Sequence, residues 1–154
     1  MFSVRTSNIK ISVPGEKEFE LVKQYVADFE LDDREMQPIQ FLIAFRCGKF
    51  LGFGRIRKHR GCDEFCTLGI VTTERKAGIG KQIVRAIIKV SNQPMYLACV
   101  IPKYFEPFGF KTVQSFPAEM QYKLNYCNAA LPVGATYVVM QYEGFAKRAT
   151  SLEV

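Results

Sequence analysis

The sequence predicts an α/β domain with a mixed, mostly antiparallel sheet of six or seven strands, flanked by helices. Three observations predict this class. Residues 40–71 hold three apolar strand candidates joined by short glycine turns, which is the pattern of an antiparallel meander. Residues 64–90 pass from a strand through a glycine loop into a helix with one apolar face. A strongly apolar stretch at 136–142 predicts a late strand that completes the sheet.

The stretch before the meander predicts one strand and one helix. Apolar and polar residues alternate over 9–13, and Pro14-Gly15 ends that strand. Residues 16–29 place apolar side chains on one helical face and begin with acidic residues, which suit the positive end of a helix dipole.

The remaining elements follow in a regular order, and residues 1–154 are expected to form a single domain. We predict meander strands at 40–46, 50–58 and 63–71, a helix at 81–90, a strand at 95–100, a short helix opened by Pro102, a strand at 110–113 and a helix at 117–127. Residues 144–154 are expected to be a tail.

Composition limits the function classes. No apolar run reaches the roughly 18 residues that a membrane span needs, and residues 1–10 lack the apolar core of a signal peptide, so we expect a cytoplasmic protein. The five cysteines are odd in number and irregularly spaced, which favours reduced thiols over a disulfide framework. The net charge of +6 suits an anionic ligand and would equally suit nucleic acid.

The glycine loop before the second predicted helix has the features of an anion site, because its N–H groups and the helix dipole would point at the same place. A Walker A loop ending at Gly80 would need Gly where Arg75 stands and Ser or Thr where Gln82 stands. A dinucleotide fingerprint starting at Gly78 would need a small residue where Ile83 stands. Both of these phosphate loops are excluded.

Two segments in order carry a family resemblance. Residues 75–80, RKAGIG, follow a strand that ends in LGI at 68–70, and residues 104–110, YFEPFGF, form a short second motif that closes in Gly-Phe. Together they resemble motifs A and B of the GCN5-related N-acetyltransferases, the GNAT proteins. The resemblance covers roughly residues 40 to 113. Two departures are Lys76, where the family often has Gly, and Thr72, where it often has Pro; neither removes a required N–H.

The resemblance implies acetyl-CoA as cosubstrate, with its pyrophosphate on the glycine loop and its pantetheine arm along the strand edge at 68–70. The backbone N–H of Ile70 would polarise the thioester carbonyl as a single oxyanion donor. Lys76 and Lys81 would add charge to the phosphate contacts. The expected cofactor-binding residues are Leu68, Ile70, Val71, Arg75, Lys76, Ala77, Gly78, Ile79, Gly80, Lys81 and Phe105.

Two residues are candidates for proton transfer. An acceptor amine is mostly protonated at neutral pH, so the chemistry requires a base. Glu64 lies six residues before Ile70, so both side chains point to the same face of the strand. In some relatives a Glu at this spacing is the base; the alternative is a surface Glu near a turn. Tyr104 is the candidate acid for the leaving thiolate, or it packs against the cofactor. The position at which the family usually has this Tyr holds Phe105, which cannot donate a proton.

Two other polar clusters carry weaker signals. His59, Cys62 and Cys66 match no standard zinc spacing, so we expect no metal. The basic run at 55–60 is either a solvated hairpin end or a contact for an acidic acceptor or nucleic acid.

These patterns predict an acetyl-CoA-dependent N-acetyltransferase, an acyltransferase that acts on a primary amine by direct attack in a ternary complex. A small-molecule acceptor is favoured over a protein, and by resemblance the charged segment 31–38 would be a mobile cover of the acceptor site. The competing hypothesis is a CoA-binding regulatory protein without turnover, which the Phe at position 105 supports. Nucleic-acid binding is a weaker alternative because the chain lacks an aromatic-basic motif of the known modules. A homodimer is left open.

Overall fold

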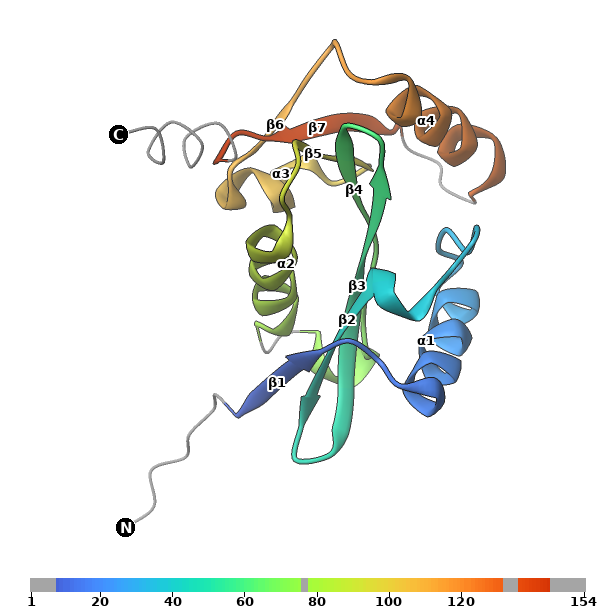
Figure 1. The fold of residues 1–154 in the computed structure, drawn as a ribbon, viewed down its shortest axis with the longest axis vertical. Helices are drawn as coiled ribbons and strands as arrows, with labels where there is room; N and C mark the ends of the chain where they lie inside the picture. The colour runs from blue at the N-terminus through green and yellow to red at the C-terminus, as the bar shows by residue number, and fades with distance from the viewer. Residues whose placement is uncertain (1–7, 76–77, 132–135, 145–154) are drawn as a thin grey trace.

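The computed structural model describes residues 8–75, 78–131 and 136–144, which form one seven-stranded sheet with flanking helices (Figure 1). The spatial order of the strands is β1-β2-β3-β4-β5-β7-β6. The strands are β1 (Ile9–Ser12), β2 (Phe41–Arg46), β3 (Lys49–His59), β4 (Cys62–Ile70), β5 (Met95–Cys99), β6 (Phe110–Thr112) and β7 (Val138–Tyr142). The α-helices are α1 (Glu16–Asp28), α2 (Ile79–Val90), α3 (Pro102–Phe105) and α4 (Ala118–Ala130), and single 3-10 turns lie at Pro38–Gln40, Thr72–Glu74 and Glu106–Phe108.

The predicted fold class is confirmed, and most element boundaries agree within a few residues. β4 and β5 run parallel and the other neighbouring strands antiparallel, so the sheet is mixed and mostly antiparallel. The β2–β3 turn uses Cys47 and Gly48, whose φ angles of 51° and 75° suit a tight hairpin. α2 begins two residues earlier than predicted, so Gly80 lies in its first turn. Most of the predicted tail, residues 145–154, lies outside the described residues.

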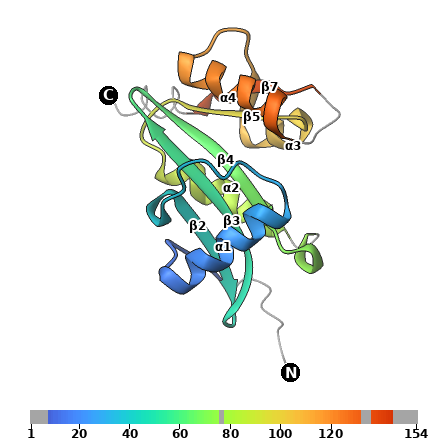
Figure 2. The same ribbon diagram turned by 90° about the vertical axis from the view of Figure 1, so that its right-hand side faces the viewer.

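α1 and α2 pack on opposite faces of the meander β2-β3-β4 (Figures 1 and 2). α2 buries Ile83 and Ile87 against β3. The helix can approach this closely because Gly54 has no side chain, and a Cβ there would lie 2.8 Å from Ile83. α1 buries Val22 and Val26 against an aromatic cluster on β2 and β3. Among the described residues, no helix is long and apolar enough to cross a membrane.

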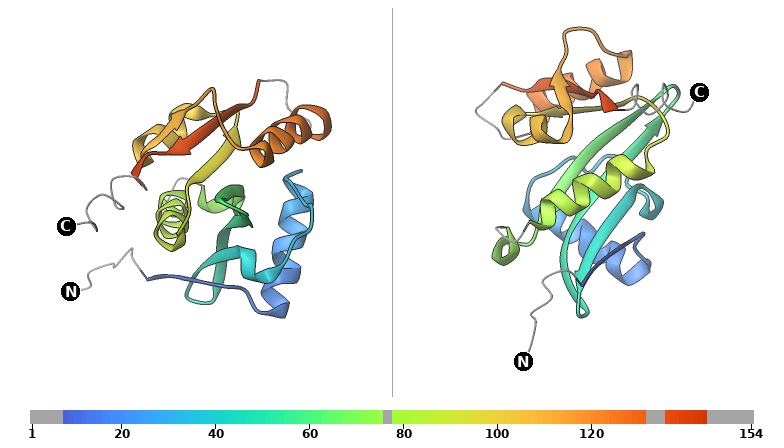
Figure 3. Two further views of the ribbon diagram at one scale, coloured as in Figure 1. Left: turned by 45° about the horizontal axis from the view of Figure 1, so that its top comes forward. Right: turned by 90° about the vertical axis from the view of Figure 1, so that its left-hand side faces the viewer.

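The sheet opens between β4 and β5. The register between them covers two pairs, Asp63 with Met95 and Glu64 with Tyr96. Beyond Glu64, β4 continues alongside β3, whereas β5 pairs with β7. The two halves of the sheet therefore diverge toward the C-terminal end of β4, as the two views of Figure 3 show.

An irregularity in β4 changes which of its side chains share a face. The register of β4 against β3 slips by one residue between Phe53 and Arg55. Thr67 lies at the slip and has a φ of 57°, which is unusual for a β-branched residue. One extra residue in a strand reverses the alternation of side chains beyond it. Glu64 and Ile70 therefore lie on opposite faces, and the prediction that they share one is wrong.

Candidate functional site

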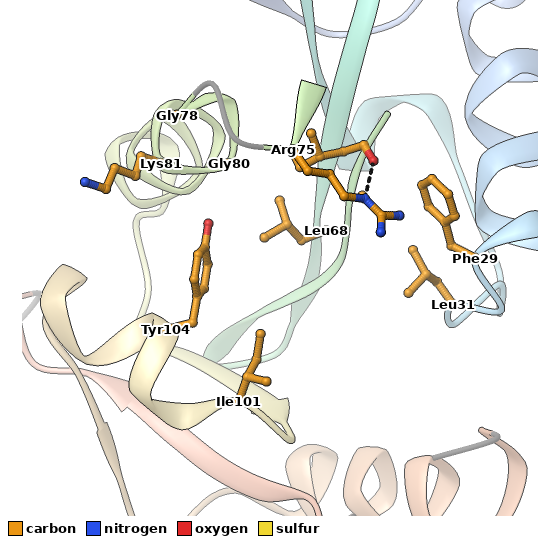
Figure 4. A pocket seen from close by; sticks show the side chains of 11 residues that line it. Phe29, Leu31, Leu68, Arg75, Gly78, Gly80, Lys81, Ile101 and Tyr104 are labelled. Atoms are coloured by element: carbon orange, nitrogen blue, oxygen red, sulfur yellow. Dashed lines mark hydrogen bonds between the residues drawn. The ribbon is translucent and has the colours of Figure 1, made fainter. Parts of the chain in front are cut away.

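The opening between β4 and β5 leads to a cavity of about 660 Å³ beside the first turn of α2 (Figure 4). β4 and the turn after it form one wall, α2 a second, and the end of α1 and the start of α3 the others. The lining residues are Phe29, Leu31, Leu68, Gly69, Ile70, Arg75, Gly78, Gly80, Lys81, Ile101 and Tyr104. We call this space the larger cavity.

The backbone of β4 faces the larger cavity at Ile70. The N–H of Val71 donates to the carbonyl of Leu51 at 2.9 Å, so the backbone groups of Val71 face β3. Because these groups alternate along a strand, the N–H and C=O of Ile70 face away from β3. The Nε of Arg75 donates to the Ile70 carbonyl at 3.2 Å, which supports this direction. An extended ligand could therefore pair with this edge as an added strand does.

The first turn of α2 offers backbone donors to an anion. Its N-cap is Gly78, with a left-handed φ of 75° that Gly adopts readily. Among the described residues no side chain caps this helix, and its first turn holds no acid. The N–H groups and the positive end of the dipole are thus directed at the cavity. Gly80 keeps the turn open, because a Cβ there would lie 2.6 Å from the Tyr104 hydroxyl oxygen.

Two polar side chains border the larger cavity from opposite sides (Figure 4). Arg75 carries its guanidinium over the ring of Phe29, with Cζ 5.0 Å from the ring centroid. Tyr104 directs its hydroxyl at the first turn of α2. Burial raises the pKa of Tyr104, so the hydroxyl stays protonated at neutral pH and can donate a hydrogen bond there.

A smaller cavity of about 220 Å³ adjoins the larger one through Leu31, Leu68 and Ile101, which line both. Its other walls come from β4, β5, α4 and the chain before β7. Its remaining lining residues are Asp32, Phe65, Cys66, Thr67, Leu97, Ala98, Cys99, Val100, Phe105, Lys123, Cys127, Leu131 and Tyr137. The two cavities therefore lie side by side between the N-terminus of α2 and α4, with Leu68 in the wall that they share.

Lys123 of α4 lies between two buried carboxylates at the smaller cavity. Its Nζ is 2.7 Å from Oδ2 of Asp32 and 3.2 Å from Oε2 of Glu64. None of the three residues is more than 4% exposed. Nε of Arg34 lies 2.9 Å from the other oxygen of Asp32, and Nε2 of His59 lies 2.9 Å from the other oxygen of Glu64. We call these five residues the buried ionic cluster; it joins α4, β3, β4 and the loop after α1.

In this cluster, the ion pairs and hydrogen bonds together shift the pKa values more than burial does. Burial alone would raise the pKa of Asp32, but Arg34 and Lys123 hold it well below its ordinary value. Burial acts in the same direction on Glu64, yet a hydrogen bond from His59 and the charge of Lys123 leave its pKa lowered. Burial would lower the pKa of Lys123, but nearby negative charges raise it. The lysine and both carboxylates are therefore charged at neutral pH.

Asp32 also anchors the loop that follows α1. Its backbone carbonyl accepts hydrogen bonds from Nη1 of Arg55 at 3.3 Å and from Oγ1 of Thr67 at 3.2 Å. Arg55 is fully buried and also donates to Oε1 of Gln40 at 2.9 Å and to the carbonyl of Arg34. The expected mobile cover is thus tied to β3 and β4, and Arg55 is no part of a solvated hairpin end.

The structure gathers most of the predicted cofactor-binding residues around the larger cavity. Those that line it are Leu68, Ile70, Arg75, Gly78, Gly80 and Lys81, together with Tyr104. Val71 does not line it, and Ile79 is buried in the core beneath α2. Phe105 is also buried in that core and lines the smaller cavity instead. Lys76 and Ala77 lie outside the described residues.

Glu64 lines neither cavity and has no exposed surface. The alternative that it is a surface Glu is therefore wrong. His59 serves as its partner, and no group of three or more His, Cys, Asp or Glu in the described chain could hold a metal ion.

Sequence reasoning missed several lining residues. Phe29, Leu31 and Ile101 are apolar residues outside any motif, and chain folding alone brings them together. Lys123 did leave a signal: it lies on the same helical stripe as Met120 and Cys127, both buried. A charged residue on a buried stripe indicates a partner elsewhere in the chain.

No family model matches the sequence, and no curated protein matches it. Its fold is similar to solved structures at low identity. N-acetylglutamate synthase from Neisseria gonorrhoeae, complexed with coenzyme A and N-acetyl-glutamate, aligns with a TM-score of 0.68 at 14% identity, over 88% of this chain and 35% of that one. A Mycobacterium tuberculosis protein in complex with CoA aligns with a TM-score of 0.67 at 17% identity, over 84% and 97%. An acyl-CoA N-acyltransferase from Pseudomonas aeruginosa aligns with a TM-score of 0.59 at 16% identity, over 86% and 97%.

The chain spans about a third of the length of the N-acetylglutamate synthase and nearly all of the other two. At these identities the likeness establishes the architecture alone. With its seven-stranded, mostly antiparallel sheet and flanking helices, the chain has the fold of the GCN5-related N-acetyltransferases.

Proposed function

We propose that this chain transfers an acetyl group from acetyl-CoA to a primary amine, by direct attack within a ternary complex. One observation carries the proposal: an outward-facing edge of β4 and a helix N-terminus that no described side chain caps meet around a single cavity. The strand edge suits the amide groups of a pantetheine arm, and the helix N-terminus suits a pyrophosphate. Fold relatives that were solved with CoA support the same cosubstrate.

The residues around the larger cavity fit this cofactor. The first turn of α2 would hold the pyrophosphate, with Lys81 and the Tyr104 hydroxyl beside it. The N–H of Ile70 would stabilise the oxyanion that forms when the amine attacks the thioester carbon. As the C–N bond forms and the C–S bond breaks, the thiolate leaves and the nitrogen loses its proton. Arg75 would have to release the Ile70 carbonyl when the pantetheine arm pairs there.

We assign the acceptor to the smaller cavity, which meets the larger one at Leu68. Its volume of about 220 Å³ is below that of sites for drug-sized ligands, so it suits a small amine. The loop anchored by Asp32 bounds this space, and its bonds to Arg55 and Thr67 restrict how far it can open. A small molecule is therefore favoured over a protein acceptor.

Glu64 is better assigned to positioning than to proton transfer. An ideal catalytic base has a pKa near the working pH, whereas neighbouring groups lower the pKa of Glu64. Its carboxylate is enclosed and bound to Lys123 and His59. We propose that Glu64 holds Lys123 and α4 against β4, and that the amine loses its proton to solvent.

A second candidate function is CoA binding without turnover. Two observations favour it. Phe105 occupies the position at which the family usually has its acid, and Glu64, the counterpart of the base in some relatives, is bound in ion pairs with His59 and Lys123. This protein would bind CoA through the same cavity.

Calorimetry with CoA, followed by an acetylation assay over a panel of small amines, tests both functions. Gly80→Asp places a negative charge against the phosphates and should weaken CoA binding at least about a hundredfold. Asn92→Asp is the matched control, because it adds the same charge at an exposed site beyond the other end of α2. CoA binding without acetylation of any amine would favour the silent binder. Equal binding by both variants and the parent would overturn the site.

A further inference from the structure

The smaller cavity offers no unpaired charge to a ligand. Asp32 and Lys123 are the charged residues among the described residues that line it, and their charges are opposite. Oδ1 of Asp32 accepts hydrogen bonds from the backbone N–H and Nε of Arg34, and Oδ2 accepts from Nη2 of Arg34 and Nζ of Lys123. Lys123 has Glu64 as a second carboxylate partner at 3.2 Å. A charged ligand could therefore pair with neither residue without breaking the buried ionic cluster.

The other titratable groups that line the smaller cavity are uncharged at neutral pH. Burial raises the pKa of the Cys66 thiol to about 11 and raises the pKa values of Cys99 and Cys127 above the ordinary value for a thiol. Burial also raises the pKa of the Tyr137 hydroxyl. All four groups therefore keep their protons. Buried thiols behave as small apolar groups, so the three cysteines add to the apolar wall of the cavity.

Most of the remaining wall is apolar. Phe65, Leu97 and Phe105 are buried there, and the hydroxyl of Thr67 is occupied, because it donates to the backbone carbonyl of Asp32 at 3.2 Å. A cavity of about 150 Å³ with leucine, isoleucine and phenylalanine walls can take up benzene. The smaller cavity, at about 220 Å³, thus has room for a branched alkyl chain or a single ring.

We propose that the acceptor is a primary amine with an apolar, uncharged body, and that the smaller cavity rejects amines that carry a carboxylate or a second ammonium. This inference rests on the proposed function. With the nitrogen at the wall that the two cavities share, beside Leu68, the body of the amine would lie in the smaller cavity. A carboxylate there would lose its hydration without gaining a cation. A second ammonium would lose its hydration in the same way, since both oxygens of Asp32 are occupied.

The test uses three amines of one skeleton. Isopentylamine is leucine without its carboxylate, and 1,3-dimethylbutylamine is leucine with a methyl group in its place, which separates charge from branching. Each is titrated by calorimetry into the protein saturated with CoA. No acetyl group is then present, and the proposed cofactor site is filled. Both uncharged-body amines should bind at least about a hundredfold more tightly than leucine, because an unpaired buried charge is costly.

Leu131→Arg adds a cation to the same wall. Leu131 is partly buried and follows the last residue of α4, where a cation suits the negative end of the helix dipole. The variant should bind leucine at least about tenfold more tightly than the parent does, because a guanidinium can pair with its carboxylate. Ala130→Arg is the matched control. It adds the same charge one residue earlier, at an exposed position that does not line the cavity, and should leave the affinities for all three amines within about twofold.

Each result bears on one of the two proposals. If the parent does not bind CoA, the proposed function fails and this inference fails with it. If the CoA-bound parent binds leucine as tightly as isopentylamine, or binds none of the three amines, the inference is overturned while CoA binding stands. If Leu131→Arg folds and its affinity for leucine matches that of the parent, the smaller cavity is not the acceptor site. If the amines bind in the expected order but acetyl-CoA does not acetylate them, the ligand class is supported and the transfer reaction fails.

Discussion

The α2 end and the α4 end of the two adjoining cavities use charge in opposite ways. At the α2 end, the N-terminal donors lack a side-chain cap among the described residues, and Lys81, Arg85 and Lys103 form no ion pair with another described residue. At the α4 end, Lys123, Asp32 and Glu64 are buried and bound to one another. The first region leaves its charged and donor groups without partners in the described chain, as the proposed binding of an anionic cofactor requires, whereas the second uses charge to join segments of the chain. Substitutions in the first should therefore alter binding, and substitutions in the second should alter stability before they alter binding.

The largest effect is expected from Lys123→Met. This change keeps much of the side-chain volume but leaves Asp32 and Glu64 facing each other without their shared cation. Removing one partner from a buried ion pair typically costs about 3–5 kcal/mol. Urea unfolding should show this loss in the free energy of unfolding. Lys111→Met is the control, since Lys111 is exposed and its nearest carboxylate, that of Glu143, is 3.9 Å away; it should change stability by less than about 0.5 kcal/mol.

The pH dependence of the same variant sharpens the comparison. In the parent, folding lowers the pKa values of Asp32 and Glu64. Their contribution to the free energy of unfolding is therefore fully present above their pKa values in the unfolded chain, about 4. It is lost as the pH falls through their lower pKa values in the folded protein. Without Lys123, burial would raise the pKa of at least one of them above its unfolded value. Lys123→Met should then recover part of its lost stability between pH 7 and 5, where the parent changes little. A parent and variant that lose stability together on acidification would contradict this role of Lys123.

Phe105→Tyr should have the next largest effect. The Phe105 ring is 7% exposed and lies edge-on to Phe65 and Phe110, with centroids 6.0 and 5.9 Å apart. A hydroxyl added to a packed ring without a partner costs about 1–3 kcal/mol. Thermal unfolding measures this cost, and CoA affinity should stay the same, because Phe105 does not line the larger cavity. Unchanged stability with increased turnover would show that the hydroxyl reaches the reacting groups instead.

The contrast between the regions also explains what the sequence could predict. The cofactor side is encoded in adjacent residues: a strand end, Gly78, Gly80 and the helix behind them, whose backbone conformation follows from local chemistry. The acceptor side combines Asp32, Glu64 and Lys123, which no local pattern connects. Period-2 and period-3.6 patterns led to the prediction of a mixed sheet of six or seven strands, and the structure has seven. Those patterns carry no signal for which distant residues meet.

The bulge in β4 shows the same limit at a smaller scale. Alternation along 64–70 predicted one face for Glu64 and Ile70, and a single extra residue at Thr67 reversed it. Neither Thr67 nor Leu68 is a residue that usually signals a bulge; the Gly in this strand is the neighbouring Gly69. Gly69 is required for another reason, since a Cβ there would lie 2.4 Å from the ring of Phe53.

A smaller effect is expected where Tyr104 meets α2. Gly80→Ala places a methyl carbon 2.6 Å from the hydroxyl oxygen of Tyr104. This distance is too short for a van der Waals contact, so the Tyr104 ring must shift. We expect CoA affinity to fall about tenfold. Tyr104→Phe removes the oxygen, and the next ring atom is 3.8 Å from the position of the added methyl carbon, which is an ordinary contact. The double variant should therefore bind CoA no more weakly than Tyr104→Phe alone. Additive losses in this double-mutant cycle would show that the methyl group acts on the phosphates directly.

The smallest effect on rate should come from Glu64→Gln, which keeps the shape of the side chain and removes its charge. Because its pKa is lowered and its carboxylate is enclosed, we expect kcat for a small amine to change less than about threefold. A true base would contribute about 10²–10⁴-fold, and its loss would be partly recovered at high pH, where the amine deprotonates without help.

Asp32→Asn is the matched control, since Asp32 binds the same lysine from the other side. If both variants lose stability and give pH–rate profiles parallel to that of the parent, Glu64 is a positioning residue. If Glu64→Gln alone loses at least about tenfold at neutral pH and recovers on alkalinisation, Glu64 is the base, and the cluster must open during turnover.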